Sequence, residues 1–433
     1  MSLAGEIESN LPTHDRTWRL IVTQDAWDAA WRGLLRRSDP WGVGHVTPQG
    51  GATCRELLVR RIQLTAETPE GRRWPPLSDW LVMRLLGQGD GDFFDSLDQV
   101  ATRIAPARNQ TLILFALDAR HPERWQGAVF HGGRCDGLDE VHVVGPGMLL
   151  LKRRYPDWDQ DGTGASLRAS RTVGAVGAAV HGRLRHATVT LVGAGRNGSA
   201  AAFQLAGLGV RRLRIIDPDI LGLENLDAMP GLTMRDVGQP KGRALARRLR
   251  QFRPDLAISV LDRAIQDRRS AAVLRERSDL LITAVDDDLP RLAAAVIAAQ
   301  TLTVHVDIGT RIQRGADGPA VLAGDARLFL PGLGCAACVG GFGDPAETLY
   351  ELNSPQGSLR RRPPLDWRQQ RAGSLVSLNS LTVSAAVQLW LDLLAGTLRS
   401  SFWQRVAWEA GRGLVSHAGP VQAARDCRFC QRL

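Results

Sequence analysis

Short apolar runs alternate with helical patterns along the carboxy-terminal two thirds of the chain. The runs are rich in β-branched residues and have the length of strands, as in ATVTLV at 187–192 and LLITAV at 280–285. Strand–helix repetition of this kind predicts an α/β fold with a doubly wound, mostly parallel Rossmann-like sheet. The predicted strands are 187–192, 214–217, 256–261, 280–285 and 303–308, and the predicted helices include one ending near 208, one beginning near 241, and 289–301.

Residues 1 to about 155 have a less regular pattern, which predicts a smaller α/β domain. Strands are predicted at 55–64, 111–117 and 140–144, and helices at 27–35, 79–86 and 94–104. A polar, Gly-rich stretch at 155–165 separates this part from the rest. Because 433 residues exceed one average domain, we expect two domains, at 1–155 and 165–433.

The net charge of +9 does not by itself indicate a nucleic-acid partner. The basic residues are almost all arginines, dispersed along the chain, and the lysines are Lys152 and Lys241. Such a composition is typical of a GC-rich genome with a solvated basic surface, so no nucleic-acid binding is expected. The sequence shows no apolar run near the roughly 18 residues of a membrane span and no secretion signal. A cytoplasmic protein is therefore expected.

A glycine-rich turn lies between the first predicted strand of the second domain and the helix after it. It reads Gly193-Ala-Gly195-Arg-Asn197-Gly198, and glycines there let the backbone approach phosphates at a helix N-terminus. Asp217 follows at the end of the next strand, where a carboxylate can accept hydrogen bonds from ribose hydroxyls. Taken alone, this pattern indicates a nucleotide and would suit an NAD-dependent oxidoreductase.

The sequence that follows the turn narrows this interpretation. It contains Asp217-Pro-Asp219, then Asn225-Leu, then Val-Gly-Gln-Pro-Lys241, and later Thr-Ala-Val-Asp286-Asp. In this joint spacing the chain resembles the ThiF/MoeB family, adenylating enzymes related to the ubiquitin-activating enzymes. An oxidoreductase has no use for these additional residues at these positions.

The resemblance covers roughly residues 165–433 and implies the roles of these side chains. Asp217 would hold the ribose of ATP, with Asp219 beside it, while Asn225 and Lys241 would contact the phosphates. Asp286 would position Mg²⁺, which prefers oxygen ligands. A carboxylate that attacks the α-phosphorus must approach a polyanion, so positive charge is needed to stabilise the leaving pyrophosphate.

The resemblance also suggests a homodimer. The segment Arg168-Ala-Ser-Arg171-Thr precedes the first strand, where the family has an arginine that reaches the partner's ATP, and Arg171 is the candidate here. An ordinary surface arginine is the alternative. Two departures stand out: the arginine of the family's N-L-x-R motif is Ala228, and the usual loop glycine is replaced by Arg196 and Asn197. Arg196 or Arg235 could supply the missing phosphate contact.

Four of the six cysteines form two C-x-x-C pairs, which in a cytosolic protein favour metal over disulfides. Four thiolates suit a tetrahedral structural Zn²⁺, which would tie the end of the chain to the segment after the sheet. The predicted ligands are Cys335, Cys338, Cys427 and Cys430.

No cysteine stands at 366–371, where family members that form a thioester carry one. The reaction would therefore stop at the acyl-adenylate, or an outside thiol or a hydroxyl such as that of Ser374 would accept the acyl group. Ser374 is also suited to capping the helix predicted at 375–394. Cys54 and Cys135 lie in the amino-terminal domain and are interpreted as core residues.

Bacterial relatives often carry a JAB-like zinc peptidase in front of this fold. Such a site needs an H-x-H pair for Zn²⁺, and none of the nine histidines forms one. A degenerate, partner-binding JAB-like domain and an unrelated α/β domain both remain open for residues 1–155.

The resulting hypothesis is ATP-dependent adenylation of the C-terminal carboxylate of a small ubiquitin-like protein in a bacterial conjugation pathway. A ubiquitin-conjugating-like enzyme would then be a further partner. The alternatives are adenylation of a sulfur carrier in thiamine or molybdopterin synthesis, an NAD-dependent oxidoreductase, and a non-catalytic dimeric scaffold of the same fold, which Ala228 motivates.

Overall fold

The structure is a computed structural model of the 433-residue chain. It describes residues 17–36, 41–50, 54–65, 79–86, 110–118, 125–131, 134–152, 163–274, 276–313, 321–340, 375–409, 411–425, 427 and 429. The chain divides into two compact units, which are described separately. One comprises Thr13–Gly162 and Arg275–Arg277, and the other includes Thr163–Leu274 and Ser278–Leu433.

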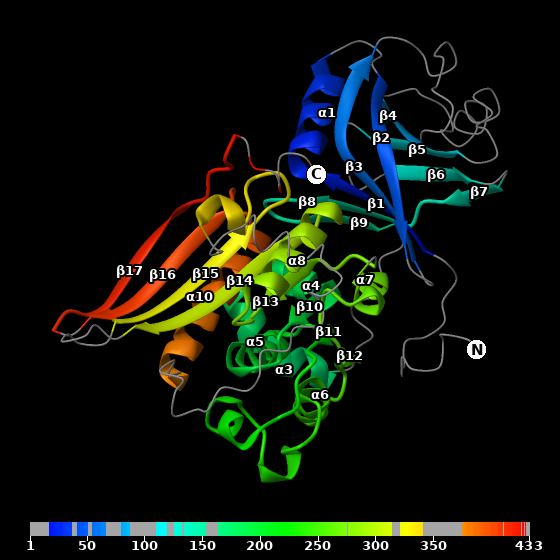
Figure 1. The fold of residues 1–433 in the computed structure, drawn as a ribbon. Helices are drawn as coiled ribbons and strands as arrows, with labels where there is room; N and C mark the ends of the chain where they lie inside the picture. Colours follow the sequence, from blue (N-terminus) through cyan, green and yellow to red (C-terminus); the bar gives the residue numbers. More distant parts are fainter. Residues whose placement is uncertain are drawn as a thin grey trace. The chain divides into compact units, whose positions relative to one another are not determined.

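The amino-terminal unit is built on a nine-stranded mixed sheet (Figure 1) with the order β7-β6-β5-β4-β2-β3-β1-β8-β9. Helix α1 packs against one face, where Trp27 and Leu34 join Leu20 and Leu57 in the core. The elements are β1 (Thr17–Thr23), α1 (Gln24–Arg36), β2 (Trp41–Gly50), β3 (Cys54–Thr65), β4 (Asp79–Leu86), β5 (Thr111–Asp118), β6 (Trp125–His131), β7 (Arg134–Gly137), β8 (Glu140–Val144) and β9 (Leu149–Lys152).

The prediction of a helix at 79–86 was wrong, because this segment is strand β4. It pairs with β5 in parallel and with β2 in antiparallel orientation. Leu81, Val82 and Met83 are all buried, so both faces of the strand are covered and no period-2 alternation marks it. The helix predicted at 94–104 lies outside the described residues. The predicted helix at 27–35 and strands at 55–64, 111–117 and 140–144 are confirmed.

The second unit contains an eight-stranded sheet with the order β12-β11-β10-β13-β14-β15-β16-β17. Neighbours from β12 to β14 pair in parallel, and β15 to β17 extend the sheet in antiparallel fashion, which confirms the mostly parallel α/β class. The strands are β10 (Thr188–Val192), β11 (Arg212–Ile216), β12 (Ala257–Leu261), β13 (Leu280–Thr283), β14 (Val304–Gln313), β15 (Val321–Phe329), β16 (Phe402–Glu409) and β17 (Gly413–Pro420).

Helices cover this sheet, and three of them, α5, α7 and α8, begin within seven residues of the end of a parallel strand. They are α3 (Thr163–Val176), α4 (Ala178–His186), α5 (Arg196–Leu208), α6 (Lys241–Phe252), α7 (Arg268–Leu274), α8 (Asp288–Gln300) and α10 (Val376–Ala395), with short 3₁₀ turns η4 (Leu223–Ala228), η5 (Met234–Asp236) and η6 (Ala336–Val339). The long strands β14 to β17 run beside one another in Figure 1, next to α10.

Helix α10 corrects the expectation that the chain lacks an apolar segment of membrane length. Its 20 residues have the length and composition of a membrane span, but 56% of the apolar window is buried inside the protein. Trp390 and Leu393 are almost fully buried, and the helix packs on α5, β14 and β15. A Cβ atom on Gly324 of β15 would collide with Thr382 of the helix. Helix α10 is therefore a core helix of this unit.

A buried polar network joins β13, β14 and β15 beneath the carboxyl ends of the parallel strands. The Thr283 hydroxyl donates to Asp307 at 2.7 Å and lies 2.9 Å from His305 Nε2. Since that hydroxyl hydrogen is engaged, the imidazole must donate from Nε2. Asp307 also accepts from Arg291 at 2.7 Å and from Arg327 at 3.0 Å. The carboxylate is 1% exposed, so the two guanidinium groups replace its lost water.

The titration of this network follows from its burial. Burial by itself would raise the pKa of Asp307, but Arg291 and Arg327 lower it below its usual value. Burial lowers the pKa of His305 to about 4, with Asp307 opposing and Arg291 reinforcing the shift. Both groups therefore keep the same charge state down to acidic pH, with His305 neutral.

We predict that stability falls as the pH is lowered from about 6.5 to about 4. Unfolded histidine titrates near 6.5 and folded His305 near 4, so the unfolded state binds the additional proton within this window. The stabilisation is complete above pH ~6.5 and declines by at most about 1.4 kcal/mol per pH unit below it. Denaturant unfolding at several pH values should show a shallower dependence for His305→Asn than for wild type. The exposed His417 on β17 provides the control, His417→Asn, and equal slopes in all three proteins would contradict the prediction.

Candidate functional site

The glycine turn lies at the carboxyl edge of the parallel sheet, between β10 and α5. Gly193 has a φ of +93°, which favours glycine, and a Cβ there would lie 2.5 Å from the Ala284 carbonyl oxygen. A Cβ on Gly198 would collide with the Gly193 carbonyl. These two glycines are required by the fold. At Gly195 a Cβ would meet nothing within 4 Å, so the fold leaves open space over this residue.

Asp217 braces the turn from the end of β11. Its carboxylate accepts from the Ala194 amide at 2.6 Å and from the Asp219 amide at 2.8 Å, and the residue is only 4% exposed. Burial raises the pKa of Asp217, and the two amides and Lys241 partly oppose that rise. Both carboxylate oxygens are thus already engaged with the backbone, one of them with the glycine turn itself.

Asp219 and Lys241 form an ion pair next to this brace. Lys241 Nζ lies 2.9 Å from Asp219 Oδ2, and the Asp219 side chain is 62% exposed. The Lys241 amide also donates to the Asp219 carbonyl at 2.8 Å. Of the two aspartates that the sequence indicated, Asp219 is the one whose carboxylate reaches solvent.

The segment between Asp219 and Lys241 is closed at its base by backbone hydrogen bonds and held by one buried carboxylate. Backbone bonds between Leu221 and Gln239 and between Gly238 and Leu221 join its two ends. Asp236, 1% exposed, accepts from Arg247 at 2.7 Å and from Arg248 at 2.8 Å. Burial would raise the pKa of Asp236, but Arg248, Thr233 and Arg247 bring it far below its usual value. Asp236 was missed from the sequence, although the adjacent Arg247 and Arg248 of α6 were a usable signal.

Asn225 lies in the 3₁₀ turn η4 of that segment. Its side-chain oxygen accepts from the Gly222 amide at 3.0 Å, which leaves the amide N–H₂ group as its donor. Arg196, the first residue of α5, donates to the Glu224 carbonyl of the same turn at 3.2 Å. Asn197 donates to the Thr310 hydroxyl of β14 at 3.3 Å. The glycine turn is therefore tied to both η4 and β14.

Asp286 is exposed just after β13. The stretch that carries it is fixed on both sides, because Arg291 donates to the Val285 carbonyl at 2.6 Å and Asp287 caps α8 through the Leu289 amide at 3.2 Å. The Ala284 amide donates to the Val192 carbonyl, and the Gly193 amide donates to the Ile216 carbonyl. The structure thus brings the glycine turn, the Asp219–Lys241 pair and the Asp286 stretch to the ends of three adjacent strands.

Arg171 is not part of this arrangement within the chain. It is exposed on α3, and no contact between it and the glycine turn is found among the described residues. Arg168, one turn earlier, is engaged locally: it donates to the Phe252 carbonyl at 2.9 Å and lies over the Phe252 ring.

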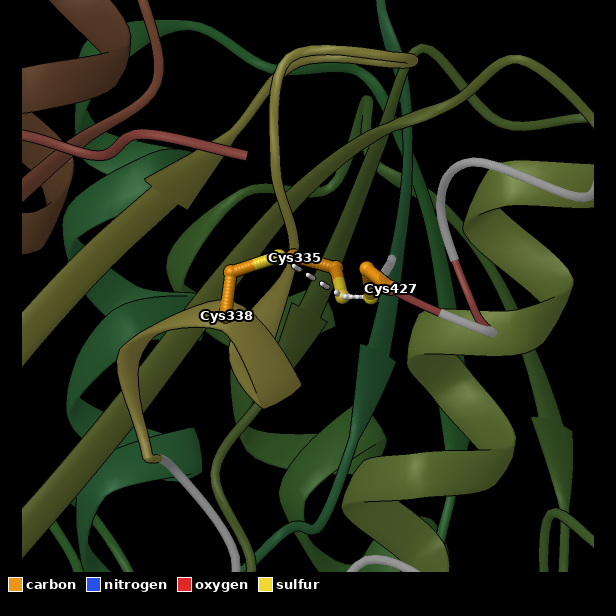
Figure 2. A group of neighbouring side chains, drawn as sticks. All are labelled: Cys335, Cys338 and Cys427. Carbon is orange, nitrogen blue, oxygen red and sulfur yellow. Dashed lines mark hydrogen bonds between the residues drawn. The ribbon is translucent and has the colours of Figure 1, made fainter. Parts of the chain in front are cut away.

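Three of the predicted cysteine ligands come together beside η6. Figure 2 shows the side chains of Cys335, Cys338 and Cys427 turned toward one another, with Cys335 Sγ 3.9 Å from Cys338 Sγ and 3.7 Å from Cys427 Sγ. Burial, aided by the other two cysteines, raises the pKa of Cys335 to about 12. Cys430 lies outside the described residues.

The sulfur positions can be compared with a known coordination geometry. Zn–S bonds of about 2.3 Å at tetrahedral angles separate the sulfurs by about 3.8 Å, and the two sulfur–sulfur distances given above lie on either side of that value. Val421 and Ala336 pack around the cluster with Phe329. All three sulfurs lie within 4.8 Å of one another, so the three thiols are close enough to hold one metal ion.

The chain is similar in sequence to known proteins. Over 124 residues the chain is 32% identical to the sulfur carrier protein ThiS adenylyltransferase of Escherichia coli (strain K12), covering 28% of this chain and 48% of that protein. Over 278 residues it is 27% identical to the ATP-dependent ubiquitin transferase-like protein Cap2 of Enterobacter hormaechei subsp. hoffmannii (strain UCI 50), covering 61% and 46%. The chain thus spans about half the length of these relatives.

Among solved structures, Escherichia coli MccB with AMPCPP and MccA matches 61% of this chain and 74% of its own, at 15% identity and a TM-score of 0.47. The sequence model of the ThiF family matches residues 168–400, more than half of the chain. The chain therefore belongs to the ThiF family.

Proposed function

We propose that this protein uses ATP to adenylate the C-terminal carboxylate of a small ubiquitin-like protein in a bacterial conjugation pathway. The observation that supports it best is the grouping, at one sheet edge of a ThiF-family chain, of the open Gly195 position, the Asp219–Lys241 pair and the exposed Asp286. A helix N-terminus and an ammonium group at this edge are suited to phosphates.

In the proposed reaction a carboxylate oxygen of the carrier attacks the α-phosphorus of ATP. A new O–P bond forms, the bond to the bridging oxygen breaks, and pyrophosphate leaves with that electron pair. Lys241 and the Asn225 amide would hold phosphate oxygens, the N-terminus of α5 would face the same charge, and Asp219 would accept from the ribose. Asp286 would hold Mg²⁺, which offsets phosphate charge when bound.

Asp217 would act indirectly in this scheme. Its carboxylate is buried and already accepts two amide hydrogens. We therefore propose that Asp217 holds the glycine turn and Asp219 in place. This revises the direct ribose contact that the resemblance implied for Asp217.

A sulfur carrier is the second candidate substrate. The similarity to the ThiS adenylyltransferase supports it, whereas the longer match to Cap2 favours a ubiquitin-like protein. Purified wild-type protein supplied with ATP and each kind of carrier would distinguish them by which carrier acquires AMP. An NAD-dependent oxidoreductase would instead bind NADH, and a dimeric scaffold would bind a carrier without consuming ATP.

Three further features belong to this proposal. We propose a cytoplasmic homodimer in which Arg171 reaches the partner's ATP, and a ubiquitin-conjugating-like enzyme as the acceptor of the activated carrier. The amino-terminal unit would bind a partner. Zn²⁺ would be held by Cys335, Cys338, Cys427 and Cys430, where it would stabilise the thiolates and join the end of the chain to η6.

Lys241→Ala and Asp286→Ala should each lower ATP–pyrophosphate exchange by more than about 100-fold, because removing one preorganised charge costs about 2.7–4 kcal/mol of transition-state stabilisation. Thermal melts should show that both variants remain folded. The matched control is Lys152→Ala, which removes the other lysine of the chain and should retain exchange. Normal exchange in either site variant would contradict the assignment.

Arg171→Ala should also abolish exchange, and coexpression with Lys241→Ala should restore part of the activity. When the two variants are coexpressed, half of the dimers contain one subunit of each and have one complete site, which gives about a quarter of wild-type activity. Arg168→Ala is the control, since that guanidinium is engaged with Phe252 in its own chain. Full activity of Arg171→Ala, or no recovery in doubly tagged mixed dimers, would contradict a shared site.

Removing Zn²⁺ should lower the melting temperature before it affects exchange at 25 °C. Metal analysis should find about one zinc per chain, and a strong chelator or Cys335→Ser should remove it together with the stabilisation. Cys54→Ser, outside the cluster, should leave the zinc content unchanged. A metal-free protein that melts at the same temperature would rule out a structural zinc.

A further inference from the structure

We infer that Arg196 supplies the phosphate-binding guanidinium that this chain lacks at Ala228. The inference rests on the proposed use of ATP and adds a binding residue to that site. It concerns a position where the chain departs from the motif it resembles: the N-L-x-R arginine is absent, and an arginine stands in the glycine turn instead.

The charge balance at the sheet edge calls for another cation. Asp219, Glu224 and three consecutive aspartates beginning at Asp286 bring carboxylates to this edge. Lys241, the ammonium group present there, already lies 2.9 Å from Asp219. A triphosphate brought into this field would meet more negative than positive charge, and the electrostatic cost is largest where water is excluded.

Arg196 has the position to meet that charge. It is the first residue of α5, so its side chain starts at the helix end that favours anions. One guanidinium nitrogen donates to the Glu224 carbonyl at 3.2 Å. Its Nε is shielded from water and has no hydrogen-bond partner among the described residues. The guanidinium is thus held against η4 with donor capacity left over.

The turn η4 is also where the missing arginine would have been. Ala228 follows Asn225 by three residues, and positions i and i+3 of a 3₁₀ turn lie above one another. Arg196 reaches the same turn from the glycine loop, where it contacts the carbonyl of Glu224, the residue before Asn225. A guanidinium is therefore present next to Asn225, although it originates from a different segment of the chain.

Three other arginines of the region already bind groups of the protein. Arg247 and Arg248 bind the buried Asp236, and Arg291 binds Asp307 and the Val285 carbonyl. Arg235, the other substitute considered from the sequence, is exposed on η5, and no contact of its side chain with η4 is found in the described part of the chain. Arg196 is the arginine that joins the glycine turn to η4.

The test compares charge with local structure at this position. Arg196→Ala should raise the KM for ATP in pyrophosphate exchange by about tenfold or more, as expected for losing a charge-assisted contact. Arg196→Gln, which keeps a donor for the Glu224 carbonyl but no charge, should show a similar rise. Affinity for AMP should change much less than affinity for ATP, since the contact is to the outer phosphates. Arg235→Ala, the matched control, should keep the wild-type KM.

The decisive variant restores the family arrangement. Arg196→Ala combined with Ala228→Arg should recover most of the lost ATP affinity, and Arg196→Lys only part, because an ammonium group lacks the planar fork. An unchanged KM for ATP in both Arg196→Ala and Arg196→Gln, or an equal loss of AMP and ATP affinity, would overturn the inference. Wild-type protein that neither binds ATP nor exchanges pyrophosphate would instead refute the proposed function, so the two failures can be distinguished.

Discussion

The contacts of the Asp217 carboxylate with two backbone amides are the interaction on which the site depends. One oxygen holds the Ala194 amide of the glycine turn and the other holds the Asp219 amide. The same buried group therefore fixes the turn and orients the exposed carboxylate that pairs with Lys241. A charge this deeply buried is costly unless it is hydrogen-bonded. The cost of burial is offset only in the arrangement that also assembles the site, so the local fold and the site geometry depend on each other.

Buried carboxylates have a similar structural role elsewhere in the second unit. Asp236 fixes the segment that carries Asn225, and Asp307 fixes β14 through Arg291, which also holds the Val285 carbonyl next to Asp286. Asp219 and Asp286, by contrast, are exposed. The division is physical: a carboxylate buried among protein donors is closed to a ligand, whereas an exposed one can exchange water for ribose hydroxyls or a cation.

Much of the second unit could be predicted from its sequence because its strands and glycine turn are local patterns. The five parallel strands and the turn at Gly193 are confirmed. Strands β15 to β17 were not predicted. Strand β16 pairs with β15 across a long separation in the chain, whereas β15 and β17 pair with strands that directly precede them. Strand β4 was mistaken for a helix because both of its faces are buried. The ion pair between Asp219 and Lys241 could not be predicted either, because it depends on how the backbone of the segment between them closes on itself.

The choice between arginine and lysine separates the structural from the ligand-binding cations of this chain. The buried carboxylates of Asp236 and Asp307 are each held by two arginines, whose planar fork can satisfy two acceptors at once and stays charged when buried. Lysine is almost absent from the composition, yet Lys241 begins α6 beside Asp219. An ammonium group has no fixed bidentate geometry, so it can leave an exposed carboxylate and turn to a phosphate with little structural change. Arg196 combines features of both classes, since one nitrogen is fixed to the Glu224 carbonyl while Nε has no partner in the described structure. A residue anchored in this way can bind an outer phosphate while keeping the glycine turn joined to η4, which a lysine in its place could not do.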